Sequence, residues 1–251
     1  MKHTYILRCV PLILILCSGS WNLLAASPAG PDPALAAAPR QDIVVMGFVG
    51  GFVRQNDLVH QEVQLAARLR KDYPSRVDVS VFANHQGQRA HDQILRLLSA
   101  DHARTLSAEE KLSARVILYG HSWGASEALA VARTLHKDGI PVLLTIQVDS
   151  VAKPGGDDRF IPENVDRAAN FFQLNGLLHG QRRIVAIDPQ RTRILGNFQF
   201  DYRTNKVNCD GFPWYAQLFM KPHIEIESDP RVWNRVDALI RSELPSMATS
   251  Q

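Results

Sequence analysis

The sequence is poor in cysteine, with three in 251 residues, and its charges nearly balance. Cys9 and Cys17 lie in the apolar segment at the start of the chain, so only Cys209 falls in the remainder. One cysteine cannot form an internal disulfide, and a hydrophobic core must therefore stabilise the fold. Lys and Arg exceed Asp and Glu by only 28 to 25. This gives no electrostatic case for binding nucleic acid or an anionic membrane surface.

A long hydrophobic run is also missing. The apolar core at residues 10–17 is too short to span a bilayer, which takes about 20 residues. It follows a basic start and precedes small residues, so residues 1–26 are predicted to be a secretory signal peptide cleaved near Ala26. The protein would then be periplasmic or secreted. A retained anchor and lipid attachment at Cys17 remain alternatives, although neither has firm support.

The rest of the chain is expected to form a linker and one domain. Four prolines between residues 27 and 40 predict an extended tether. The folded domain is predicted at residues 41–245, and the sequence shows no internal repeat and no second domain.

Apolar runs alternate with segments of helical spacing along the first part of this domain. The predicted strands are residues 42–49, 76–82, 115–119 and 140–148, and the predicted helices are residues 57–71, 88–98 and 122–137. This alternation predicts a mostly parallel sheet with helices on both faces. Residues 184–187 and 192–200 are expected to form a hairpin or two late strands. Asp229-Pro230 is typical of the start of a last helix.

The most specific signal is Gly-His-Ser-Trp-Gly at residues 120–124. This G-x-S-x-G pattern lies between a predicted strand and a predicted helix, which is the context of a nucleophile elbow. The sharp turn projects the hydroxyl of Ser122 above the sheet, and the glycines leave room for the strand to meet the helix. The serine also lies at a helix N-terminus, where free N–H groups favour a developing negative charge.

On these residues the sequence resembles the α/β-hydrolase superfamily. The resemblance implies an α/β-hydrolase fold, and the short chain leaves no room for a large lid domain. Members often carry a glycine-rich loop after an early strand, whose backbone completes an oxyanion hole, and residues 46–51 (Met-Gly-Phe-Val-Gly-Gly) match this loop. The expected backbone donors are Phe48 and Trp123, with Val49 as an alternative to Phe48.

A serine needs a histidine to accept its proton and an acid to orient that histidine. The resemblance implies the chain order serine, acid, histidine. His223 precedes the last predicted helix, where the superfamily places its base; His179, in a polar loop, is the alternative. Asp149 ends the strand after the elbow helix, at the carboxyl edge of the predicted sheet. Asp188 is the second candidate for the acid.

These residues predict an exported serine hydrolase that cleaves carboxylic ester or thioester bonds, with Ser122, Asp149 and His223 as its catalytic triad. The expected substrate is a small-molecule or lipid ester, and the reaction needs no cofactor and no metal. A peptidase or amidase with the same machinery is the alternative enzyme. A catalytically silent binding protein of the same fold is an alternative of another class. The sequence does not indicate the oligomeric state.

Overall fold

Six parallel strands form the central sheet of the computed structural model, which describes residues 43–102 and 104–246. Their spatial order is β2-β1-β3-β4-β6-β8. The strands of this sheet are β1 (Ile43–Val49), β2 (Val77–Ala83), β3 (Val116–His121), β4 (Val142–Val148), β6 (Val165–Gln173) and β8 (Arg193–Phe200). Two short strands, β5 (Phe160–Ile161) and β7 (Val185–Ala186), form a separate parallel pair.

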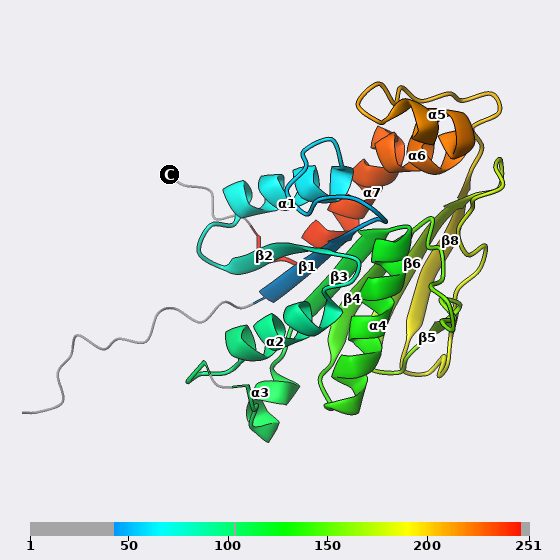
Figure 1. The fold of residues 1–251 in the computed structure, drawn as a ribbon. Helices are drawn as coiled ribbons and strands as arrows, with labels where there is room; N and C mark the ends of the chain where they lie inside the picture. The colour runs from blue at the N-terminus through cyan, green and yellow to red at the C-terminus, as the bar shows by residue number, and fades with distance from the viewer. Residues whose placement is uncertain (1–42, 103, 247–251) are drawn as a thin grey trace, which may run out of the picture. The chain divides into compact units, whose positions relative to one another are not determined.

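Helices cover both faces of the sheet (Figure 1). The helices are α1 (Gln61–Asp72), α2 (Gly87–Leu98), α3 (Ala108–Leu112), α4 (Trp123–Lys137), α5 (Trp214–Phe219), α6 (Lys221–Ser228) and α7 (Pro230–Arg241). Buried residues of α1 and α7 belong to one hydrophobic cluster, and those of α2 and α4 belong to another on the opposite face. This arrangement is the one predicted for an α/β-hydrolase fold.

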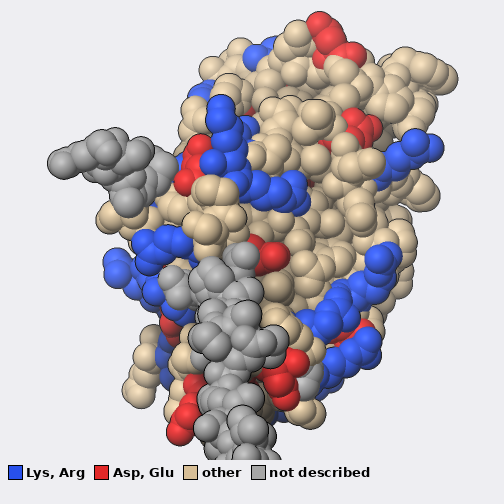
Figure 2. Space-filling model, turned by 90° about the vertical axis from the view of Figure 1, so that its left-hand side faces the viewer, with Lys and Arg blue, Asp and Glu red and all other residues tan. Residues whose placement is uncertain are grey.

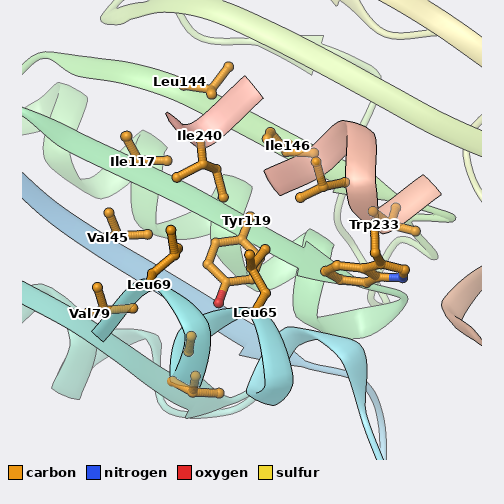
Figure 3. Packing of buried hydrophobic residues seen from close by; sticks show 14 of the residues in the cluster. Val45, Leu65, Leu69, Val79, Ile117, Tyr119, Leu144, Ile146, Trp233 and Ile240 are labelled. Carbon is orange, nitrogen blue, oxygen red and sulfur yellow. The ribbon is translucent and has the colours of Figure 1, made fainter. Parts of the chain in front are cut away.

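The two clusters follow from the alternation of side chains along buried strands. Val45 and Ile117 point into the cluster with α1 and α7, whereas Val44 and Leu118 point into the cluster with α2 and α4. Tyr119 is fully buried in the first cluster, and its hydroxyl donates a hydrogen bond of 2.9 Å to the carbonyl oxygen of Glu62. Figure 3 shows this cluster, in which Leu65 and Leu69 of α1 lie close to Tyr119.

The last helix begins as the sequence predicts. The side chain of Asp229 accepts a hydrogen bond from the backbone N–H of Arg231 at the N-terminus of α7. Val232, Val236 and Ile240 then lie fully buried on one face of this helix. Their spacing explains why α7 packs against the sheet.

The strands after residue 149 differ from one of the two expectations. Residues 184–187 and 192–200 do not pair as a hairpin, because β7 pairs with β5 and β8 pairs in parallel with β6. The hairpin alternative is therefore wrong, and two late strands are observed. Strand β6 was not predicted, because its apolar residues are interrupted by Asp166, Arg167 and Asn170. These polar residues hide the continuous apolar run that marks a buried parallel strand.

The predicted signal peptide and linker, residues 1–40, lie outside the described residues. Within the described part of the chain, no helix combines the length and the apolar character that crossing a membrane requires. On the face drawn in Figure 2, basic side chains lie close to acidic ones.

Candidate active site

Ser122 occupies a sharp turn between β3 and α4. Its φ and ψ are 55° and −127°, a conformation that side chains with a Cβ rarely adopt. The turn is tight because the start of α4 packs against the end of β1. A Cβ at Gly124 would lie 2.2 Å from the carbonyl oxygen of Phe48, so only glycine fits there. The strand, the strained serine and the helix are therefore arranged as the G-x-S-x-G pattern predicts.

A cavity of about 450 Å³ adjoins this serine. Its walls come from residues that follow the carboxyl ends of neighbouring strands: Gly50 and Gly51 after β1, Ser122 after β3, and Val151 after β4. His223 of α6 also lines it. The carboxyl edge of a parallel sheet is where such folds form their ligand sites.

His223 and Asp149 lie in direct contact although 74 residues separate them. The Nδ1 atom of His223 is 2.7 Å from Oδ2 of Asp149. Asp149 follows β4, is fully buried and has a φ of 44°. The structure therefore brings the sequence-predicted acid and base together, beside the cavity that Ser122 also lines.

Two further residues hold the carboxylate of Asp149. The backbone N–H groups of Gly180 and Gln173 donate to Oδ1, at 2.8 and 3.2 Å, and the side-chain amide of Gln173 donates to Oδ2 at 2.9 Å. A Cβ at Gly180 would lie 2.2 Å from the carbonyl carbon of Asp149, so this approach requires glycine. The sequence analysis did not find Gln173 or Gly180, because no local motif marks either of them.

The alternative candidates lie elsewhere. Asp188 is in the turn after β7, where its Oδ1 accepts the backbone N–H of Gln190 at 2.8 Å, and it does not line the cavity. His179 is exposed, and its Nδ1 is 3.3 Å from the carbonyl oxygen of Gly180. The contact between Asp149 and His223 thus distinguishes these two residues from their competitors.

The first expected donor of the oxyanion hole needs a correction. Phe48 lies inside β1, is fully buried, and pairs with both β2 and β3. It does not line the cavity, whereas Gly50, Gly51 and Phe52 do. The part of the loop that lines the cavity therefore begins at Gly50, two residues after the expected donor Phe48. Trp123, the second expected donor, is the first residue of α4 and lines the cavity.

A second group of titratable side chains lies behind His223. The rings of His121 and His223 are 4.5 Å apart, and Nε2 of His121 is 3.2 Å from the carbonyl oxygen of His223. Nδ1 of His121 is 3.2 Å from Glu227, which also contacts Nδ1 of His60. Glu62 completes the group. None of these four residues (His60, Glu62, His121 and Glu227) was predicted to act in the site, since the fold brings them together from distant segments.

Burial perturbs the ionisation of these residues. It lowers the pKa of the His121 imidazole well below its usual range, and the neighbouring histidines lower it further. Burial raises the pKa of Glu227 to about 8. Burial and the charge of Glu227 together raise the pKa of Glu62 well above its ordinary value. With His121 neutral and its Nε2–H donated to the His223 carbonyl, its Nδ1 can accept a hydrogen bond from the protonated carboxyl group of Glu227.

Comparisons with known proteins find likeness in structure alone. RedJ, a thioesterase of the prodiginine biosynthetic pathway in Streptomyces coelicolor, is 13% identical, with a TM-score of 0.43 over 88% of this chain and 96% of its own. A proposed YdeN-like hydrolase from Pectobacterium atrosepticum is 17% identical, with a TM-score of 0.37 over 82% of this chain and 94% of its own. No protein-family model and no curated protein sequence matches the chain.

Likenesses this distant do not indicate which reaction the chain carries out. The fold rests instead on the chain's own structure: the parallel sheet, the helices on both of its faces and the turn at Ser122 are the arrangement predicted for an α/β-hydrolase fold.

Proposed function

We propose that this protein is a serine hydrolase that cleaves carboxylic ester or thioester bonds through an acyl-enzyme intermediate. The hydrogen bond between His223 and Asp149, together with the cavity that His223 and the strained Ser122 both line, is the observation that carries the proposal. A histidine held by a buried carboxylate and placed near a serine is the arrangement that activates a weak nucleophile.

In this mechanism, Oγ of Ser122 attacks the substrate carbonyl and Nε2 of His223 accepts the serine proton. Asp149 keeps the remaining ring proton on Nδ1, so Nε2 stays free to act as the base. His223 then gives the proton to the leaving alcohol or thiol. Water, deprotonated by the same histidine, attacks the acyl-enzyme and releases the acid.

The tetrahedral intermediate carries a negative oxygen that backbone N–H groups would stabilise. The N–H of Trp123 is at the first position of α4, where helices leave such groups without an internal partner. The loop at residues 50–52 borders the same cavity and would supply the second donor.

The surroundings of the cavity favour an apolar acyl group. Phe52 is 98% exposed at its edge, and Trp214, Leu218 and Phe219 of α5 are also exposed. Tyr215 of α5 is half-exposed and lines the cavity together with Phe52. Phe52 and Tyr215 thus give the cavity a large aromatic lining that is partly open to solvent, which is typical of a site that receives an apolar ligand.

A covalent probe tests the reaction. A fluorophosphonate should label the wild-type chain and leave Ser122→Ala unlabelled, because only an activated serine reacts. Hydrolysis of p-nitrophenyl esters should become more efficient from acetate toward longer acyl chains, and a matched thioester series then ranks the two bond types. A folded wild-type chain that neither reacts with the probe nor hydrolyses any of these substrates would contradict the proposal.

Export is the other part of the proposal. It rests on the basic start, the short apolar run and the small residues within residues 1–26. Mass spectrometry of the protein recovered outside the cytoplasm should find a chain that begins near Ser27. Recovery of that protein with Met1 still attached would argue against cleavage.

A further inference from the structure

We infer that His60, Glu62 and Glu227 form a binding site for one zinc ion, next to the candidate active site and separate from its serine. The inference does not depend on the proposed hydrolase reaction, because zinc binding is measured without substrate. No metal was expected from the sequence, because the predicted serine mechanism needs none.

Geometry brings the three side chains to one place. One ligand atom from each lies within 4.8 Å of the other two, and all three residues are buried. Zinc ligands sit about 2.0–2.2 Å from the metal, so tetrahedral ligand atoms are roughly 3.4 Å apart. Small rotations of the side chains would therefore bring them into coordination. His60 and Glu227 already touch through Nδ1 and Oε1.

The carboxyl group of Glu62 points independently to a cation. Glu62 is fully buried, and among the described residues no N–H group or hydroxyl donates to its carboxyl, whose polar partner is the carboxyl of Glu227. Two buried carboxyl groups in contact repel each other unless a proton or a cation lies between them. Because this side chain is directed at Glu227 and His60, a cation bound there would meet both oxygen and nitrogen ligands.

The charges around these carboxyl groups are also compatible with a bound metal ion. Glu62 and Glu227 are both acidic, and within residues 43–102 and 104–246 neither forms an ion pair with a Lys or Arg. One imidazole and two carboxylates are a ligand set that suits zinc. His60 and Glu227 also line the cavity, so water could enter and complete the coordination.

A metal at this position would join two segments that hold the candidate active site. His60 and Glu62 belong to the start of α1, whereas Glu227 lies one turn after His223 on α6. Residues four apart share one face of a helix. Zinc bound to Glu227 would therefore fix the helix that positions His223.

The test compares zinc binding to the purified chain and two glutamine variants. After removal of metal with EDTA, the chain is dialysed against Zn²⁺ buffered with a competing chelator, and bound zinc is measured by mass spectrometry. The control is Glu225→Gln, because Glu225 is fully buried on the same helix but lies outside the cluster. The wild type and this control should each bind about one zinc per chain, with equal affinity.

The Glu62→Gln variant should bind zinc at least about tenfold more weakly, since even residues that merely support a metal ligand change affinity by about 10- to 100-fold. If circular dichroism shows that this variant does not fold, Glu227→Gln takes its place with the same expected loss. The inference is overturned if the wild type binds no zinc. It is equally overturned if the folded cluster variant binds zinc as tightly as the wild type does.

Discussion

Replacing Asp149 with asparagine should disable the enzyme through the tautomer of His223. Two backbone N–H groups, of Gln173 and Gly180, point at Oδ1 and cannot turn away. The asparagine oxygen must take that position, which places its NH₂ group against Nδ1 of His223. The ring then carries its proton on Nε2, the atom that has to accept the proton of Ser122.

The wrong tautomer in such a triad can lower kcat by about 10⁴-fold, which corresponds to roughly 5.4 kcal/mol of transition-state stabilisation. The free energy of unfolding should fall by less than this value. In the wild type, the side-chain amide of Gln173 donates a hydrogen bond to Asp149. In the variant, the new NH₂ group faces this amide, so two donors meet. An unsatisfied buried group of this kind costs about 1–3 kcal/mol.

Asp188→Asn is the matched control, because its side chain accepts one backbone hydrogen bond in a turn and an asparagine oxygen accepts the same bond. Its kcat should stay within about twofold of the wild type, as surface substitutions usually change free energies by less than about 0.5 kcal/mol. The assay is kcat on a p-nitrophenyl ester, with the melting temperature of each variant recorded. The reasoning fails if Asp188→Asn is the more damaging change, or if folded Asp149→Asn retains full activity.

Three further results are expected. Ser122→Ala and His223→Ala should each remove most of kcat, and the double variant should be scarcely slower than either, whereas additive losses would mean that the two act separately. Gly180→Ala should lower both kcat and the melting temperature, because its Cβ would collide with the backbone of Asp149; unchanged values would show that the loop adapts. In metal-free protein, the raised pKa of Glu227, about 8, means that the unfolded chain loses this proton first. The contribution of Glu227 to the unfolding free energy should therefore fall as pH rises from about 4.5 to 8, and it is measured as the pH-dependent difference between the wild type and Glu227→Gln in urea titrations.

The first half of the domain could be predicted because most of its strands are buried on both faces. Residues 42–49 read as an uninterrupted apolar run, and the structure has β1 there at Ile43–Val49. Strand β6 could not be found in this way. It lies between β4 and β8, yet its Asn170 is fully buried and donates from its side chain to the carbonyl oxygen of Gln181. Such a polar residue is satisfied only by the tertiary fold.

The residues of the candidate site also differ in how well the sequence predicts them. Ser122 could be predicted because a turn imposes a local pattern of glycines, and Asp149 because it ends a recognisable strand. Gly180 carries no such signal: its role follows from the 2.8 Å contact with Asp149, which lies 31 residues away along the chain. Phe48 was predicted wrongly for a related reason. Residues 46–51 match a glycine-rich loop, but the sequence alone does not show at which residue the strand ends.

His121 shows what the motif leaves out. In the G-x-S-x-G pattern its position accepts any residue, so the sequence assigns it no role. In the structure its ring lies against that of His223 and its two nitrogens reach His223 and Glu227. The residue before the serine therefore connects the elbow to α6, and through Glu227 to the start of α1 at His60. Three distant segments thus meet at Glu227. The position of the candidate base depends on contacts on both sides of its ring, with Asp149 on one side and His121 on the other.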